Sequence, residues 1–260
     1  MNLGVIIMND NSEMGICRTC LDNVKLTDEH VPPRSANNSH PIKLYNGLDL
    51  ISNKNDKPWD VNGLRYDNKQ KGRTFKSICA KCNNNFGSWY VPYYAEFVNE
   101  IYDRIIINPQ NQNVTGEFVI KNMCSLAIFK HVITMFMVIN SIKIFDDTVY
   151  DFISSRESTV FPSDKYRVYM YAFRGGMERF LPVSVMRKED GILKISEIST
   201  IPVGFVLCFN SNRHSSVKGA DITFMSESNY DVKHDIKLNM NIYQSHTIIP
   251  LDYRAKDEFD

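Results

Sequence analysis

The stretch CRTCLDNVKLTDEHVPP, residues 17–33, begins with a Cys-x-x-Cys pair, and a second pair begins the stretch CAKCNNNFG, residues 79–87. Zinc prefers four thiolate or imidazole ligands in a tetrahedron, and two such pairs supply them in the closed form of a structural site. We therefore predict a structural zinc ion bound by Cys17, Cys20, Cys79 and Cys82. The alternative is a redox dithiol, but neither pair lies in the βαβ pattern that a thioredoxin-like motif needs.

The segments beside the cysteine pairs predict two strands and a helix. Residues 24–31 and 74–78 are the strand candidates, and a Pro-Pro pair ends the first because proline cannot donate to a sheet ladder. From Asn83 onward, aromatic and apolar residues recur at spacings of three and four, which is the period of a helix face. Pro92 interrupts this pattern, so we expect the helix to break or restart there.

The long segment 34–73 is polar, with many asparagine, aspartate, lysine and glycine residues and no sustained hydrophobic period. We expect a long loop with short helical or strand pieces around residues 42–50, and such a loop inside a compact domain is usually functional or partly disordered. Residues 1–16 are expected to form a short lead-in with one strand. Cys124 and Cys208 lie in apolar surroundings, so we expect both to be small buried hydrophobic residues.

Three polar residues beside the cysteine pairs are suited to chemistry. Glu29 and His30 lie at the end of the first predicted strand, and Asn83 follows the last cysteine at the start of the predicted helix. A neutral imidazole with a pKa near neutrality can deprotonate water, whereas carboxylate and amide oxygens are hard ligands that suit Mg²⁺ or Mn²⁺. Because zinc would hold the two segments together, His30 and Asn83 are expected to lie near each other. A base beside a divalent ion is what hydrolysis of a phosphodiester requires.

These motifs together resemble the zinc-bearing HNH endonucleases of the ββα-metal fold, over residues 14–100. The resemblance implies that His30 is the general base, that Glu29 and Asn83 bind the catalytic ion, and that the four cysteines bind structural zinc. It implies a zinc-stapled ββα-metal domain at residues 1–110. Stand-alone bacterial members of this family with an added domain often serve in phage defence or restriction, so the resemblance also suggests an antiviral role.

The sequence departs from the family pattern between the two cysteine pairs. Family members place a middle asparagine a few residues before the second pair, where this chain has residues 73–74, so Asn62 and Asn68 are the candidates for that role. Gly87 stands where some relatives carry a second metal-binding histidine. The resemblance therefore implies a catalytic ion with fewer protein ligands and more water ligands.

Two of the proposed ligands have neighbours of the same chemical type. Asn84 and Asn85 directly follow Asn83 and could take its place as the amide ligand. Asp28 precedes Glu29 and could likewise be the carboxylate that binds the ion. The sequence leaves both alternatives open, because neighbouring residues of one type differ only in the direction of their side chains.

A basic segment around the second cysteine pair predicts a nucleic-acid partner. Positive side chains can neutralise backbone phosphates, and the resulting affinity falls as salt is added. DNA is the expected partner, and RNA is an alternative substrate. The alternative to a nucleic-acid partner is an ordinary solvent-exposed basic surface that binds none. The residues expected to contact phosphate are Arg34, Lys69, Lys71, Arg73, Lys76 and Lys81.

Residues 114–260 predict a second α+β domain with one long buried helix and an antiparallel sheet. Residues 117–142 carry apolar side chains over most of a helical surface, which is typical of a helix inside a core. The polar segment 108–113 is the expected linker. Strands rich in aromatic and β-branched residues are expected at residues 166–173, 181–185, 193–198, 205–209, 221–225 and 237–249, the first of them closed by Gly175-Gly176.

The charge balance limits the class of protein. The chain has 30 basic and 30 acidic residues, which argues against a strongly basic DNA-binding protein. The balanced charge is still compatible with a nuclease, because only the surface that contacts phosphate must be basic. No apolar run reaches membrane-spanning length and no signal peptide is recognisable, so we expect a cytoplasmic protein without membrane contact.

The expected function is metal-dependent hydrolysis of phosphodiester bonds in DNA by the first domain. His30 would activate water, and a Mg²⁺-class ion would stabilise the leaving oxygen. The second domain is expected to sense a ligand, contact DNA or bind a partner protein, and the oligomeric state is left open. The alternative from another class is a non-catalytic zinc-stapled module that binds nucleic acid or protein.

Overall fold

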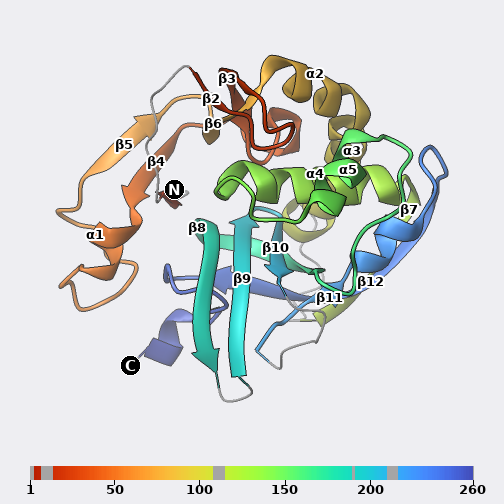
Figure 1. Ribbon diagram of the computed structural model, residues 1–260. Helices are drawn as coiled ribbons and strands as arrows, with labels where there is room; N and C mark the ends of the chain where they lie inside the picture. The colour runs from red at the N-terminus through yellow and green to blue at the C-terminus, as the bar shows by residue number, and fades with distance from the viewer. Residues whose placement is uncertain (1–2, 7–13, 108–114, 189–190, 210–215, 260) are drawn as a thin grey trace.

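The chain folds as a mixed α+β protein in which helices lie between two sheets (Figure 1). The computed structural model describes residues 3–6, 14–107, 115–188, 191–209 and 216–259. Within those ranges, one sheet has nine strands and the other has three. The longest helix, α4, lies between the large sheet and the helices that follow the second cysteine pair (Figure 1).

The elements of the first half alternate short strands with helices. In chain order they are β1 (Leu3–Ile6), β2 (Met14–Ile16), β3 (Asn23–His30), η1 (Arg34–Ala36), β4 (Ile42–Asn46), α1 (Gly47–Ile51), β5 (Tyr66–Lys69), β6 (Thr74–Cys79), α2 (Ala80–Trp89), α3 (Val91–Tyr102) and η2 (Asp103–Ile107).

The second half is mostly strand around one long helix. Its elements are β7 (Thr115–Met123), α4 (Ser125–Ile139), α5 (Asp147–Ser154), β8 (Arg167–Lys188), β9 (Gly191–Thr200), β10 (Val203–Cys208), β11 (Ala220–Asp221), η3 (Thr223–Glu227), β12 (His234–Ser245) and η4 (Lys256–Phe259).

The small sheet has the order β2-β3-β6, and both of its pairings are antiparallel. Leu26 of β3 lies opposite Cys79 of β6, and His30 lies opposite Thr74. The two strands predicted beside the cysteine pairs are therefore confirmed. The predicted break at Pro92 is also confirmed, because α2 ends at Trp89 and α3 begins with proline in its first turn, where a missing N–H costs no hydrogen bond.

The large sheet is mixed, whereas an antiparallel sheet was predicted for the second half of the chain. β1 pairs in parallel with β4 and β8, and β12 pairs in parallel with β8, while β8, β9 and β10 pair antiparallel. The periodicity of a strand shows which residues are buried but not the direction of its neighbour. The sheet includes β4 and β5 of the predicted first domain beside the strands of the predicted second.

The helix predicted at residues 117–142 begins later than expected. Residues 115–123 form strand β7, which pairs with β12, and α4 starts only at Ser125. Phe118 and Ile120 are buried and Lys121 is exposed, so this segment alternates as a half-buried strand does. Its apolar residues fit a helical period as well, and pairing with β12 decides between the two.

Strand β8 continues through Gly175-Gly176, although that pair was predicted to end it. A Cβ on Gly176 would lie 2.1 Å from the carbonyl oxygen of Ser245, and both glycines have φ above 100°. Glycine is therefore needed for close approach of β12 rather than for a turn. Most of the segment 221–225 is the 3₁₀ turn η3 instead of a strand, and the expected linker at 108–113 lies outside the described residues.

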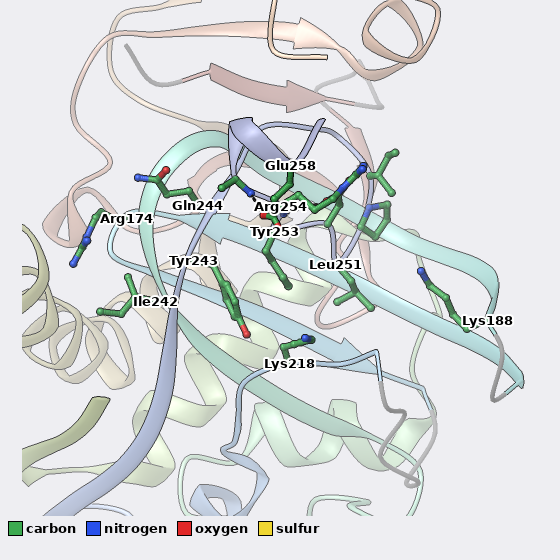
Figure 2. Close-up of a pocket in the computed structure, with 14 residues that line it drawn as sticks. Arg174, Lys188, Lys218, Ile242, Tyr243, Gln244, Leu251, Tyr253, Arg254 and Glu258 are labelled. Carbon is green, nitrogen blue, oxygen red and sulfur yellow. Dashed lines mark hydrogen bonds and ion pairs between the residues drawn. The ribbon is translucent and has the colours of Figure 1, made fainter. Parts of the chain in front are cut away.

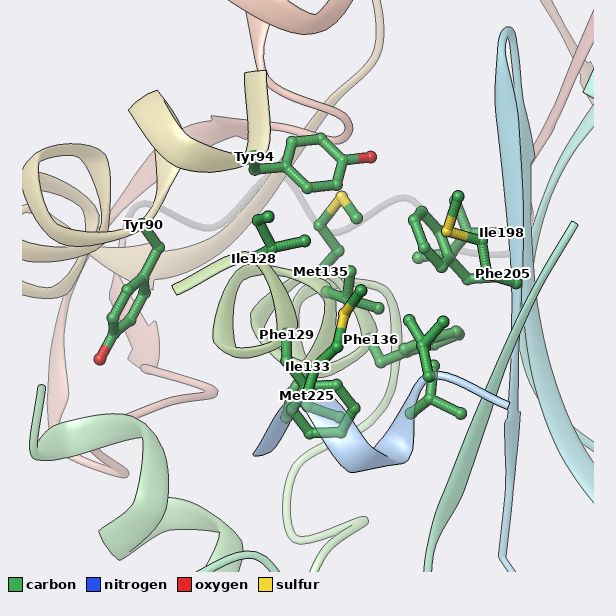
Figure 3. Close-up of a cluster of buried hydrophobic side chains, with 14 of the residues drawn as sticks. Tyr90, Tyr94, Ile128, Phe129, Ile133, Met135, Phe136, Ile198, Phe205 and Met225 are labelled. Carbon is green, nitrogen blue, oxygen red and sulfur yellow. The ribbon is translucent and has the colours of Figure 1, made fainter. Parts of the chain in front are cut away.

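The predicted burial of the long helix is confirmed, because all fifteen residues of α4 are buried. Figure 3 shows its side chains between Tyr90 and Tyr94 on one side and Ile198 and Phe205 on the other. The same core extends from the cysteine pairs to β12. Cys124 and Cys208 are buried as predicted. No helix in the described ranges is long and apolar enough to cross a membrane.

Candidate metal centre and adjacent polar site

The four paired cysteines form one cluster. Their sulfur atoms all lie within 4.8 Å of one another, and they could hold a metal ion. The first pair lies in the turn between β2 and β3, Cys79 ends β6, and Cys82 lies in the first turn of α2. The antiparallel register of β3 and β6 brings the two pairs together, although a long stretch of chain separates them. The cluster therefore joins the two strands and the helix at one point.

Backbone N–H groups support these sulfurs in the manner of a metal-binding turn. The amide of Cys79 donates to the sulfur of Cys17 at 3.3 Å, and the amide of Cys82 donates to the sulfur of Cys79 at 3.4 Å. The N-terminus of α2 adds a positive field that favours thiolates. The hydrogen bond between Cys17 and Cys82 lowers the pKa of Cys17 and raises that of Cys82. Four sulfurs this close fit a soft cation that keeps all of them ionised.

The cluster is fastened to the central helix by Arg18. Its backbone N–H donates to the carbonyl oxygen of Ser77 at 2.9 Å, and its guanidinium donates to the carbonyl oxygen of Val138 near the end of α4. A cation is favoured at a helix C-terminus, where carbonyl groups lack partners within the helix. The first cysteine pair is thus tied both to β6 and to the core helix.

His30 ends strand β3 and is half-buried. Its Nε2 atom lies 3.0 Å from the carbonyl oxygen of Lys71, and Arg34 donates to the same Nε2 from 2.9 Å. Burial, together with the nearby Arg34, lowers the pKa of His30 below its usual value. The imidazole is therefore neutral at pH 7, which is the protonation state that a general base needs.

Asn83 is oriented by two hydrogen bonds to β3. Its Nδ2 atom donates to the hydroxyl oxygen of Thr27 at 3.1 Å and to the carbonyl oxygen of Asp28 at 3.3 Å. Both donor hydrogens are used, so the carbonyl oxygen Oδ1 is the atom left to bind a cation. The contact places Asn83 two residues from His30 along β3, a distance of about 7 Å along the strand.

Glu29 is half-buried on β3, between His30 and Asp28, whose carbonyl oxygen accepts from Asn83. Burial raises the pKa of Glu29 to about 7. Among the residues that the structure describes, no basic side chain forms an ion pair with it. A partly buried carboxylate without a cation fits the role of a ligand for a hard metal ion.

The structure identifies Asn38 as the residue that braces the loop, which the sequence did not indicate. Asn38 is 7 % exposed, and its Nδ2 donates to the carbonyl oxygens of Pro32 and Arg73 at 2.6 and 2.8 Å. Its Oδ1 accepts from the amide of Arg73 at 2.6 Å. A Cβ on Gly72 would lie 2.2 Å from that Oδ1, so the close approach needs glycine. Asn38 thereby fixes the turns beside His30.

The two candidates for this bracing role lie elsewhere. Asn62 is exposed and lies in the loop before β5. Asn68 is exposed on β5, opposite Lys43 of the large sheet. A polar loop with many asparagines gives no local signal for the one that becomes buried, because its partners are backbone groups from two distant turns.

Replacing Asn38 with alanine is expected to lower the free energy of unfolding by about 2 kcal/mol, because the carbonyl oxygen of Pro32 and the amide of Arg73 lose their partner. Zinc content should stay unchanged, since Asn38 does not contact the cysteines. Urea unfolding followed by circular dichroism measures the effect, with Asn68→Ala as the exposed control. Equal stability of the two variants would show that Asn38 does not hold the loop.

The predicted phosphate contacts divide into an exposed group and one buried residue. Arg34, Lys69, Lys71 and Lys81 are exposed, and Lys76 is half-buried opposite Asp28. Arg73 is 4 % exposed, and its guanidinium lies over the rings of Phe75 and Phe180 at 4.1 and 5.7 Å. Burial lowers its pKa to about 9. Arg73 therefore packs in the interior and does not belong to the basic surface.

The comparisons with known proteins leave the site to be judged from its own geometry. No protein-family model matches the chain, and neither a curated protein nor a solved structure matches it.

Proposed function

We propose that the chain is a metal-dependent endonuclease of HNH type that hydrolyses phosphodiester bonds in DNA. The observation that supports this most directly is the pair of hydrogen bonds from Asn83 to Thr27 and Asp28, on the strand that His30 ends. The order β3, β6, α2, with four cysteines at the junction, agrees with a zinc-stapled ββα-metal unit. Zinc is the structural ion that we propose for the cysteines.

In this proposal the divalent ion is Mg²⁺ or Mn²⁺, and Glu29 and Asn83 would hold it through the carboxylate and the amide oxygen Oδ1. When bound, such an ion stabilises negative charge on the phosphate and on the departing oxygen. Glu29 is favoured over Asp28, because Glu29 is half-buried whereas Asp28 is exposed.

His30 is the proposed general base. Its neutral Nε2 takes the proton of an attacking water once Arg34, which donates to the same Nε2 in the free protein, has turned to a phosphate oxygen. The carbonyl oxygen of Lys71 then accepts the N–H of the imidazolium that results. The exposed side chain of Lys71 adds positive charge to this part of the surface.

Replacing Asn83 with alanine tests the proposed ligand set, with Asn84→Ala as the matched control. Asn84 is exposed on the same turn of α2, and α2 keeps its cysteine cap in both variants. We expect Asn83→Ala to raise the Mn²⁺ concentration for half-maximal plasmid nicking by at least about tenfold, because one ligand is lost. Equal metal dependence in the two variants would remove Asn83 from the site.

The rival function is a zinc-stapled module that binds nucleic acid without cutting it. Cleavage assays on supercoiled plasmid and on single-stranded RNA, each with Mg²⁺ and with Mn²⁺, distinguish the endonuclease from the binding module. Cleavage of DNA that depends on the divalent ion supports the proposal, and cleavage of RNA alone changes the substrate class. Salt-dependent binding of DNA without cleavage of either substrate would favour the binding module.

A further inference from the structure

A large pocket opens in the second half of the chain, on the strands of the large sheet. It has a volume of about 860 Å³ and is lined by residues of β8 and β12 together with the segment 249–255 that follows them. Figure 2 shows Arg174 and Lys188 at opposite ends of the pocket, with Tyr243 and Lys218 between them. The volume is in the range of small-molecule sites. The nuclease proposal uses none of these residues.

The cations of this pocket outnumber its available carboxylates. Arg174, Lys188 and Lys218 form no ion pair with any residue that the structure describes. Lys218 is exposed and Lys188 is half-buried, so both lysines are accessible to a ligand in the pocket.

The two carboxylates of the pocket already have partners. Asp252 forms an ion pair with Arg254 at 2.8 Å, and Glu258 accepts the amide of Ala255 at 2.5 Å. Lys188 and Lys218, which have no ion pair within the described ranges, also lie at separate points along the pocket (Figure 2). This distribution fits a ligand with more than one negative charge.

The middle of the pocket offers a flat apolar surface. Tyr243 is half-buried, and its ring stacks on Tyr253 at 4.4 Å with an angle of 15° between the planes. Ile242 and Leu251 lie beside it. A tyrosine held in this way presents its remaining surface to the pocket, where a planar ring can stack or pack against it.

One wall of the pocket is fixed by an ion pair beneath it. Arg179 and Glu197 are fully buried and meet at 2.6 Å. Glu197 accepts the amide of Leu251 at 2.9 Å and the hydroxyl of Tyr253 at 2.9 Å, while Arg179 donates to the carbonyl oxygen of Ile249 at 2.5 Å. The pair therefore clamps the segment 249–253 onto the sheet. A pocket with a fixed wall loses little conformational freedom when it binds a ligand.

We propose that this pocket binds a nucleotide, with the base against Tyr243 and the phosphates on Lys218 and Lys188. A nucleotide is the ligand class that combines a planar ring with several negative charges. A fatty acid has one charge and no planar ring, and inorganic polyphosphate would leave the tyrosine surface unused. The site lies apart from the proposed nuclease residues, so it would give the chain a second, ligand-binding function.

Isothermal titration calorimetry of the full chain with ATP, adenosine and tripolyphosphate tests the proposal. His30→Ala protein without added divalent ions keeps the measurement independent of nuclease activity. We expect ATP to bind at least about tenfold more tightly than adenosine or tripolyphosphate, because only ATP uses both halves of the pocket. No binding of ATP at millimolar concentration would overturn the proposal, and so would equal affinity for ATP and tripolyphosphate.

Two variants test whether ATP binds in this pocket. Lys218→Ala removes an exposed cation and Tyr243→Leu removes the ring, and each is expected to weaken ATP binding by about tenfold. Lys237→Ala, on an exposed position of β12 outside the pocket, is the matched control and should leave binding unchanged. Circular dichroism confirms that each variant is folded. Unchanged affinity in both Lys218→Ala and Lys188→Ala would show that ATP binds elsewhere.

Discussion

Replacement of His30 with alanine is expected to lower the rate of Mn²⁺-dependent cleavage of plasmid DNA by at least about 10²-fold, which is the usual contribution of a general base. The imidazole lies at the end of β3, and its lowered pKa keeps it neutral at pH 7. Conversion of supercoiled to nicked and linear plasmid, followed over time, measures the rate.

The control for this experiment is His40→Ala. His40 is an exposed histidine in the loop after η1, so its loss should leave both cleavage and stability unchanged. Affinity for DNA should be similar in all three proteins, because the basic surface is retained. If His30→Ala cleaves as fast as wild type, the proposed mechanism fails, even if the protein proves to be a nuclease.

Loss of the structural metal is expected to have the largest effect on stability. Cys79→Ser removes a sulfur that ends β6, caps α2 and lies in the continuous core. We expect a fall of about 3 kcal/mol or more in the free energy of unfolding and of about 10 °C in Tm, since metal binding contributes directly to folding. Zinc content should drop from about one ion per chain to near zero, measured by atomic absorption on purified protein.

A buried cysteine outside the cluster provides the matched control. Cys208 is 1 % exposed on β10, so Cys208→Ala changes the core without touching the metal centre. This variant should retain zinc and lose only the small free energy of packing. Stoichiometric zinc in Cys79→Ser protein would contradict the four-cysteine site. Together, the His30 and Cys79 variants separate the loss of chemistry from the loss of the fold that supports it.

Local elements beside the cysteines were predictable because their signals are local. A Pro-Pro pair ends β3, Pro92 restarts the helix, and both features act within a few residues. The segment 115–123 was not predictable in the same way, because its apolar residues satisfy a helical period as well as a strand period. Its pairing with β12, far along the chain, decides the outcome.

In the candidate site, too, features with a local sequence signal were predictable and features set by distant contacts were not. The sequence pointed to the cysteine cluster through the spacing of its pairs, and the structure brings the four sulfurs together. It did not reveal Asn38, because one buried asparagine among many is distinguished only by backbone partners from another turn. It placed Arg73 on a basic surface, whereas Phe75 and Phe180 enclose that side chain from two different sheets.

By itself, the sequence determined which residues could bind a metal, where the strands beside them end and which helix is buried, because residue chemistry, proline and apolar periodicity act locally. Only the tertiary structure decided strand direction, the contact of Asn83 with β3, and the pocket between β8, β12 and the segment 249–255. These features depend on contacts between distant segments, and the free energy of such contacts is set by packing that no single segment contains.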